Sequence, residues 1–346
     1  MKFKLILLLI FLISCGSDST TENLSSDNYQ DEEYEEESDD EEYEEESDDE
    51  EYEEESDDEE ESQDQDNEGE SLYDEYGEWD KGTTYFDTSS STSSGWYMGQ
   101  GTDREEHVHE GMQTSDGGFI AIGHHWEKEE DPTGFTDMII LKTDSNGKEL
   151  WQTIIGTADK FDVGYAVDEL SDGYVASGGL HKDGYQKSAI VKLDINGNII
   201  WQKIFNHSGV GGIRGIEVLN NDDIVVTGYK EGDEEGFLFI SDGSQGFITK
   251  LSTTGEVIWD KNLSAMQGTK VKKTSKGGFV VGSVEWVDAG LNAAMHYLDS
   301  SGNTLSTKLF GGNNNVQLFD MDITDNDYVV FTGHTTGFQT ANWDCI

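Results

Sequence analysis

The chain has 346 residues and a formal net charge of −53, from 74 Asp and Glu against 21 Lys and Arg. Nucleic-acid binding requires clustered Lys and Arg to neutralise phosphates, and this composition excludes it. The charge is uneven, because residues 16–80 contain 36 acidic residues and no Lys or Arg. The part after residue 80, with 38 acidic and 19 basic residues, is long enough for one domain with a hydrophobic core.

The first 14 residues have the features of an export signal. Two lysines precede an unbroken apolar run over residues 5–13, and Ser14 follows. Because the run is far shorter than the roughly 20 residues of a membrane-spanning helix, we predict a signal peptide over residues 1–14. Residues 12–15, Leu-Ile-Ser-Cys, resemble the lipobox of bacterial lipoproteins, which implies cleavage before Cys15 and diacylation of its sulfur.

Lipidation of Cys15 would attach the protein to a membrane. Two or three acyl chains bury enough CH₂ groups, at about 0.8 kcal/mol each, for stable anchoring. We therefore predict an extracytoplasmic protein, lipid-anchored to the cell envelope at the outer membrane or the cell surface. A plain secretory signal with an incidental cysteine is the alternative. The other cysteine, Cys345, has no nearby partner in the sequence, so neither a disulfide framework nor a cysteine metal site is expected.

Residues 15–80 are expected to form the lipidated cysteine followed by a disordered acidic stalk. Tyr34, Tyr43 and Tyr52 recur in units of Glu-Tyr-Glu-Glu-Glu-Ser-Asp-Asp with almost nothing apolar between them. Such a low-complexity segment cannot bury a core, and its like charges repel, so we expect an extended spacer. Diffuse binding of Ca²⁺ or of a basic partner is the alternative. Residues 81–94 are expected to be a linker.

The domain over residues 95–346 contains an internal repeat of about fifty residues. Five copies of a turn are followed by a short β-branched or aromatic strand ending at Gly, at residues 116–123, 172–178, 222–228, 276–282 and 326–333. A further candidate strand precedes each copy, and a hairpin follows four of them, at residues 139–151, 192–201, 250–259 and 297–306. Four consecutive antiparallel strands per repeat predict an all-β fold, a small β-propeller of about five four-stranded blades.

The fifth repeat stops short of its fourth strand, which leaves an exposed sheet edge. Residues 95–100 match the fourth strand of the other repeats, since Trp96 precedes Asp116 by nearly the same spacing as Trp151 precedes Asp172. We therefore predict that this N-terminal strand completes the last blade and closes the ring, because closure removes the edge.

The hairpins that begin at Asp144, Asp194 and Ser252 share the pattern Asp/Ser-x-x-Gly-x-x-x-Trp. They resemble the tryptophan-docking motif of quinoprotein-like propellers, and the repeats resemble those of many bacterial secreted and lipoprotein propellers. The resemblance covers roughly residues 96–346. It implies that the tryptophans dock between neighbouring blades, with Ser306 replacing the last one. The residues assigned to docking are Trp96, Trp151, Trp201 and Trp259.

Catalytic and metal-binding motifs are weak. His107 and His109 share one face of a strand, and His124 and His125 lie nearby, but two ligands do not define a metal site, so no metal is expected. The loop at Asp144 lacks the downstream ligands of a Ca²⁺ loop. With no phosphate loop or nucleophile elbow, we expect neither a cofactor nor enzyme activity. A degenerate quinoprotein-type enzyme is the alternative.

The loops between the second and third strands differ in length and carry both acidic and aromatic residues. Variable loops on a rigid scaffold are the usual place for binding, so a protein, a basic peptide or a glycan is a candidate partner. We expect a monomeric binding or scaffolding module; the alternative is an envelope-assembly factor similar to the propeller lipoprotein of the barrel-assembly machine. The loop residues chosen as binding candidates are Trp126, Phe135, Tyr185, Phe237 and Trp286.

Overall fold

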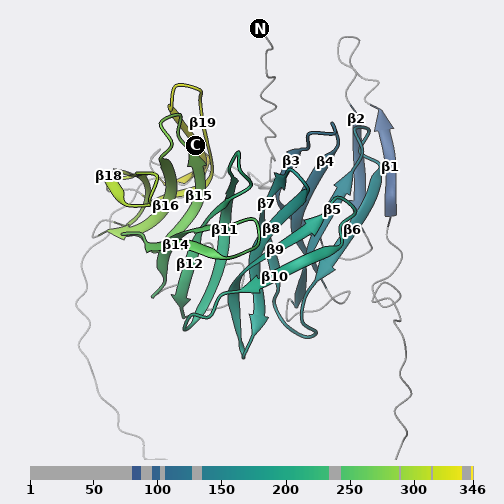
Figure 1. Ribbon diagram of the computed structural model, residues 1–346, viewed down its shortest axis with the longest axis horizontal. Coiled ribbons are helices and arrows are strands. Elements are labelled where there is room, and N and C mark those ends of the chain that lie inside the picture. Colours follow the sequence, from purple (N-terminus) through teal and green to yellow (C-terminus); the bar gives the residue numbers. More distant parts are fainter. Residues whose placement is uncertain are drawn as a thin grey trace, which may run out of the picture. The chain divides into compact units, whose positions relative to one another are not determined.

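The computed structural model describes residues 80–86, 96–101, 106–126, 135–233, 243–287, 290–312, 315–336 and 344–345. The predictions for the signal peptide, Cys15 and the acidic stalk lie outside these residues, apart from Asp80. Within them every regular element is a β-strand, as predicted (Figure 1). The described part contains no helix that is both long and apolar enough to cross a membrane.

Four sheets have four antiparallel strands each, and each strand pairs with its neighbours along the chain. The first sheet comprises β3 (Glu106–Gln113), β4 (Phe119–Trp126), β5 (Thr136–Thr143) and β6 (Glu149–Ile155). The second comprises β7 (Val163–Leu170), β8 (Gly173–Lys182), β9 (Tyr185–Asp194) and β10 (Ile199–Ile204). The third comprises β11 (Val210–Val218), β12 (Ile224–Gly232), β13 (Gln245–Leu251) and β14 (Val257–Asn262). The fourth comprises β15 (Gln267–Lys273), β16 (Phe279–Val287), β17 (Gly290–Leu298) and β18 (Thr304–Phe310).

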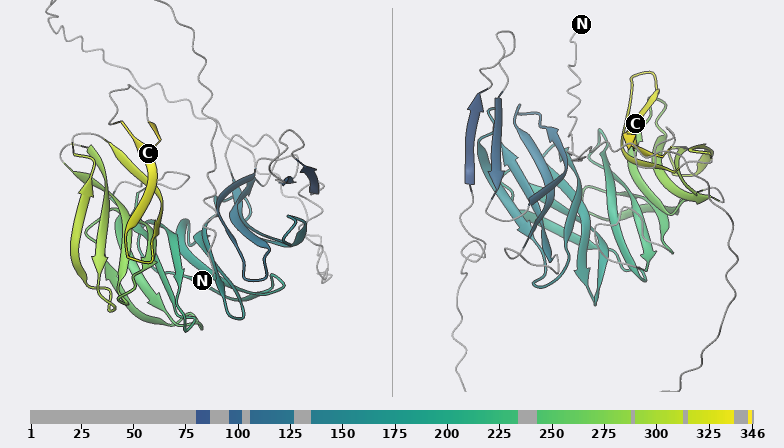
Figure 2. Two further views of the ribbon diagram at one scale, coloured as in Figure 1. Left: turned by 90° about the horizontal axis from the view of Figure 1, so that it is seen from above. Right: turned by 180° about the vertical axis from the view of Figure 1, so that it is seen from behind.

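The fifth sheet has three described strands, β19 (Val316–Ile323), β20 (Val329–Thr335) and β21 (Asp344–Cys345). The predicted repeat is therefore confirmed as four complete sheets and one partial sheet. Figure 2 shows the sheets following one another in chain order, each beside the next. The first strands of neighbouring sheets contact each other, which places them on the inner side of the array.

The prediction that an N-terminal strand completes the last sheet is wrong for this structure. The predicted strand forms as β2 (Trp96–Gly101), but it pairs with β1 (Asp80–Phe86) in a separate two-stranded sheet. The segment expected to be a linker thus begins with a strand. Only residues 87–95 separate the two strands, so this local pairing closes a much shorter loop, at lower entropic cost, than pairing with the fifth sheet.

The turns that join the third and fourth strands explain the repeated Gly of the hairpins. Gly147, Gly197, Gly255 and Gly302 have φ between 78° and 84°, a left-handed conformation that favours glycine. In the first sheet, Oδ1 of Asp144 accepts hydrogen bonds from two backbone N–H groups of the turn, at 2.7 and 3.0 Å. The carboxylate that resembled a Ca²⁺ ligand is therefore engaged in holding the turn.

Hydrophobic clusters lie between neighbouring sheets. One of them joins the first and second sheets through Ile122, Met138 and Val191. Another joins the second and third sheets through Ile190, Val226 and Phe247. Because sheets pack on both faces of the second, third and fourth members, the second strands β8, β12 and β16 begin with runs of at least six buried residues. In β20 of the fifth sheet, buried, half-buried and exposed residues are mixed.

Candidate functional site

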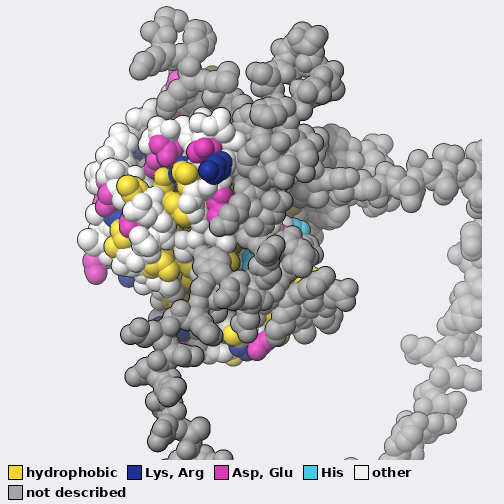
Figure 3. Space-filling view, turned by 90° about the vertical axis from the view of Figure 1, so that its right-hand side faces the viewer, with side chains coloured by type: hydrophobic (Ala, Val, Ile, Leu, Met, Phe, Trp, Pro, Cys, Tyr) yellow, Lys and Arg dark blue, Asp and Glu magenta, His cyan; other side chains and the backbone are white. Residues whose placement is uncertain are grey.

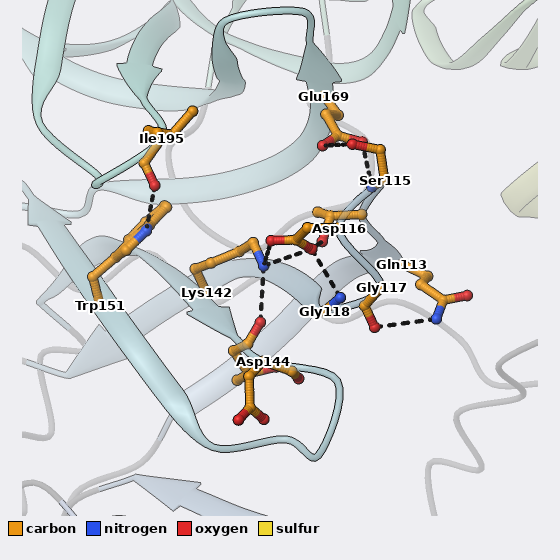
Figure 4. Close-up of polar contacts among 12 residues, drawn as sticks. Gln113, Ser115, Asp116, Gly117, Gly118, Lys142, Asp144, Trp151, Glu169 and Ile195 are labelled. Atoms are coloured by element: carbon orange, nitrogen blue, oxygen red, sulfur yellow. Dashed lines mark hydrogen bonds and ion pairs between the residues drawn. The ribbon is translucent and has the colours of Figure 1, made fainter.

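Three of the predicted docking tryptophans, one in each of the first three sheets, contact the sheet that follows. The indole N–H of Trp151 donates to the Ile195 carbonyl of the second sheet at 3.0 Å (Figure 4), and that of Trp201 donates to the Thr253 carbonyl of the third at 3.2 Å. The Trp259 ring lies 6.1 Å from that of Phe279 in the fourth sheet. These contacts have the geometry expected of a docking role. The side chain of Trp96 lies outside the described residues.

A serine–carboxylate contact repeats between the turns of neighbouring sheets. The backbone N–H and hydroxyl of Ser115 donate to the Glu169 carboxylate, at 2.7 and 2.8 Å (Figure 4). Ser171 donates to Asp222 in the same way, and Ser275 donates to Asp327. All three serines lie in the turn between the first and second strands. We call these contacts the serine latches; they show that this turn lies beside its counterpart in the next sheet.

A lysine–aspartate pair lies behind each of the first two latches. Lys142 Nζ contacts Asp116 at 3.1 Å and also donates to the Thr143 carbonyl at 2.8 Å. A hydrogen bond from the Thr114 hydroxyl, followed by one from the Gly118 N–H and the charge of Lys142, lowers the pKa of Asp116 to about 2. Lys192 and Asp172 form the equivalent pair at 2.9 Å in the second sheet. The polar groups of these turns are thus engaged within the domain.

Between the first two sheets these turns surround an open cleft of about 570 Å³, which we call the turn-side cleft. Leu150 and Ile195, which are 55% and 64% exposed, lie at its rim. The rings of Trp151 and Tyr174, with centroids 5.7 Å apart, form part of its wall. Its polar lining is Ser115, Asp116, Lys142, Glu169, Ser171 and Asn196.

Sequence reasoning did not find this cleft, because it lies at the end of the sheets opposite the loops that were chosen. Burial, followed by the negative charges of Asp116 and Glu169, raises the pKa of Tyr174 to about 12, so its hydroxyl stays protonated. A usable signal was present in the sequence. Leu150, Ile200 and Ile258 each precede a docking tryptophan. Successive side chains on a strand point to opposite faces, so an apolar residue beside a docked tryptophan is expected on the opposite face of the strand.

Two solved structures to which the chain is similar are WD40 domains. The WD40 domain of Neurospora crassa Pan2 is 12% identical, with a TM-score of 0.44, and the alignment covers 69% of this chain and 60% of that domain. The WD40 β-propeller domain of Doa1 is 16% identical, with a TM-score of 0.34, covering 54% of this chain and 50% of that domain. Successive antiparallel sheets joined by docking tryptophans and latches decide the fold class. The domain is a small β-propeller.

The chain thus spans about half to three fifths of the length of these two propellers. No protein-family model matches it, and no curated protein matches it in sequence. The propeller fold is therefore established by the structure, whereas the finer resemblance to quinoprotein-like repeats rests on the sequence motifs. The sheets are called blades from this point.

The inner strands of the propeller carry a network of charged side chains that the sequence analysis missed. Lys270 of the fourth blade contacts Glu110 of the first at 2.9 Å and Asp320 of the fifth at 3.6 Å. Burial raises the pKa of Glu110, although the charge of Lys270 opposes the shift. Burial also raises the pKa values of Asp168 and Glu217 on the second and third blades. Asp168 accepts a hydrogen bond from the Val218 N–H of the third blade at 2.7 Å, and Glu217 lies 3.9 Å from Lys272 of the fourth, so each contacts the following blade.

Every inner strand is also interrupted at the same place. The pairing register between the first and second strands shifts after Val108, Gly164, Ile213, Gly268 and Leu318. A bulge of this kind adds one residue to the inner strand and redirects its side chain. In the first three blades these residues are His109, Tyr165 and Arg214; the first two rings are 5.4 Å apart, and Arg214 lies 4.1 Å from the Tyr165 ring centre.

The histidines singled out in the sequence do come together. His109 Nε2 lies 3.0 Å from His124 Nδ1, and the His107 and His124 rings are 4.9 Å apart. Burial, with the positive charge of Arg214, lowers the pKa of His109 to about 3; burial, with the neighbouring histidines, lowers that of His124 to about 2. Both imidazoles are therefore neutral near pH 7. Among the residues that the structure describes, no group of three or more His, Cys, Asp or Glu is arranged to hold a metal ion.

The predicted binding residues differ in exposure. Tyr185 and Trp286 are 52% and 55% exposed, at the turn that begins β9 and near the end of β16. Trp126 and Phe135 are half-buried on either side of residues 127–134. Phe237 lies outside the described residues. Two of the five candidates therefore offer a large exposed aromatic surface, at the end of the blades opposite the turn-side cleft.

Proposed function

We propose that this protein is a lipid-anchored, extracytoplasmic propeller that acts as a non-enzymatic binding or scaffolding module. The observation that supports this most is a contrast in exposure between two groups of residues. One group lies at the end of the blades where loops connect the second and third strands. Tyr185 and Trp286 present aromatic surface there, while the docking tryptophans and the charged groups of the turns and inner strands are engaged within the domain. Large exposed aromatics on a rigid scaffold are typical of interaction sites.

Absence of enzyme activity is part of the proposal. The hairpins that resemble quinoprotein repeats place their tryptophans and aspartates in contacts between and within blades, which gives these residues a structural role. We expect the purified protein to show no quinone-dependent dye reduction. Robust reduction that is lost on mild unfolding would favour the enzyme alternative.

Metabolic labelling with palmitate tests the anchor. Wild type and Cys345→Ala should both take up label, whereas Cys15→Ala should take up none, because Cys15 supplies the acylated sulfur. Protease treatment of intact cells then reports whether the propeller faces outward. Label on Cys15→Ala, or its absence from wild type, would contradict the proposed attachment.

The binding surface is tested on intact cells by cross-linking. A photoreactive amino acid is placed at Tyr185 or Trp286, and at Leu305 as a control of similar exposure on another part of the propeller. Discrete adducts from the first two positions alone would support a partner on this surface. Adducts with outer-membrane barrel-assembly subunits would favour the envelope-assembly alternative, and identical adducts from all three positions would contradict a specific surface.

A further inference from the structure

We propose that the turn-side cleft binds a basic polypeptide segment that inserts one apolar side chain as an anchor. This inference rests on the proposed binding function and assigns it a second surface. The cleft lies between the first and second blades, at the end of the blades opposite Tyr185 and Trp286. Its volume of about 570 Å³ is within the range of natural ligand sites.

The rim of the cleft is apolar. Leu150 and Ile195 line it with more than half of their surface exposed, and the indole N–H of Trp151 donates to the Ile195 carbonyl (Figure 4). A side chain entering here would cover both aliphatic groups and the Trp151 ring. Removing this remaining apolar surface from water would contribute to the affinity in proportion to the area that is covered.

Apolar exposure continues beyond the cleft along the outer strands. Ile200, Ile258 and Leu305 occupy the same place in their hairpins as Leu150, and they are 52%, 51% and 70% exposed. Figure 3 shows apolar side chains exposed beside acidic ones over the described part of one side of the molecule. Ile200, Ile258 and Leu305 are not among the residues that line the cleft, so they offer matched apolar positions outside it.

The charge of the cleft selects the partner. Asp116 and Glu169 line it, while the only base among its described lining residues, Lys142, is buried and paired with Asp116. Asp194 adjoins Ile195 in a turn of the second blade, and Asp172, which is paired with Lys192, follows Ser171. Hydrogen bonds from Asn198 and from the turn backbone lower the pKa of Asp194, which keeps it ionised. This negative rim complements Lys and Arg side chains, and it repels anionic lipid headgroups.

Fluorescence anisotropy with a labelled peptide tests the proposal on the full-length protein. The probe has one central leucine flanked by lysines, and the control probe has serine in place of leucine. At about 0.15 M salt, screening limits attraction between charges more than about 8 Å apart, and the serine probe, which carries the same lysines, measures binding by charge alone. We expect the leucine peptide to bind at least ten times more tightly than the serine peptide. Equal affinities would overturn the proposal.

Variants locate the binding. Leu150→Gln combined with Ile195→Gln should lower the affinity for the leucine peptide at least tenfold. It should change the affinity for the serine peptide by less than twofold. Ile258→Gln combined with Leu305→Gln has the same chemistry away from the cleft and should leave both peptides within twofold. Equal losses in the two double variants, with unchanged thermal unfolding, would overturn the proposal.

A charge variant completes the test. Asn196→Lys adds a positive charge to the cleft lining and should lower the affinity for the leucine peptide about threefold or more. Ser301→Lys, at the same place in the fourth blade, should leave this affinity unchanged. Binding to zwitterionic vesicles that is lost in the Leu150/Ile195 variant would assign the cleft to lipid and overturn the proposal. Failure of these peptide tests would leave the palmitate and cross-linking results, which test the broader function, unaffected.

Discussion

The third and fifth blades contain nearly the same second strand in different surroundings. β12 and β20 follow the same type of turn, in which Leu219 N–H bonds Asp223 and Thr324 N–H bonds Tyr328. This places Val225 and Val330 at equivalent positions, yet Val225 is fully buried and Val330 is 53% exposed. The third blade has described blades packed on both faces. Burial in this fold is therefore set by the neighbours of a blade more than by the strand sequence.

Replacing a docking tryptophan should give the largest loss of stability. Trp201→Ala removes an indole that contacts the third blade through the Thr253 carbonyl, and we expect the free energy of unfolding to fall by about 3 kcal/mol. Trp286→Ala, which removes an exposed ring, should change it by less than about 0.5 kcal/mol. Urea denaturation of both variants measures the difference. Similar losses would show that the docking contact contributes little.

Acid should destabilise the first blade through His124. The pKa of His124 is about 2 in the folded protein, so only the unfolded chain gains this proton as pH falls below 6.5. Between pH 6.5 and 4.5 this proton uptake by the unfolded chain lowers the free energy of unfolding by about 2.5 kcal/mol, at roughly 1.4 kcal/mol per pH unit. Asp162, whose pKa burial raises to about 7, acts in the opposite direction over this range.

The His124 contribution is isolated by comparing pH profiles. The free energy of unfolding of His124→Gln should fall less steeply below pH 6.5 than that of wild type, because the substituted side chain takes up no proton in either state. His334→Gln, at the equivalent position of β20, is the matched control. Identical profiles for wild type and His124→Gln would contradict the assignment of a buried neutral imidazole.

The equivalent valines give a direct test of the comparison. Val225→Ala should lower the free energy of unfolding by about 2 kcal/mol, because it removes buried methyl groups and leaves a cavity. Val330→Ala should lower it by less than about 0.5 kcal/mol. If the two substitutions cost the same in urea denaturation, the fifth blade is packed on both faces in solution.

The smallest expected effect is at a serine latch. Ser171→Ala removes the hydroxyl that donates to Asp222 and should cost about 1 kcal/mol. Asp325→Ala, at the latch position of the fifth blade, should cost less, because no latch from it to a following blade is present in the described part of the chain. Thermal unfolding of the two variants ranks them, and a larger effect of Asp325→Ala would reverse the expected order.

The repeating parts of the fold could be predicted from the sequence because their signals are local. Gly147 and its equivalents need a left-handed φ, which fixes the hairpins, and the docking tryptophans follow those glycines at constant spacing. The glycine and the tryptophan are also matched in space: a Cβ at Gly197 would lie 2.6 Å from the Trp151 ring. The repeat therefore predicted the turn, and the resemblance to tryptophan-docking repeats implied that the tryptophan packs between blades.

The features that were missed depend on which residues meet across blades. Lys270 and Glu110 are distant in the sequence, and only the radial order of blades brings them together. The pairing of β2 with β1 was missed because Asp80–Phe86 belongs to no repeat and gave no periodic signal. The turn-side cleft was missed because its lining comes from turns that each look purely structural. Two of the five predicted binding residues are well exposed, and one lies outside the described residues.

The contact between Lys270 and Glu110 has a consequence for how the domain comes apart. Stacked repeats that touch only their neighbours can fray one unit at a time from either end. An ion pair between the fourth and first blades couples units that are three apart in the stack, so loosening one exposes an uncompensated buried charge in the other. Amide hydrogens of β3 and β15 should therefore exchange with solvent together, in a single cooperative opening.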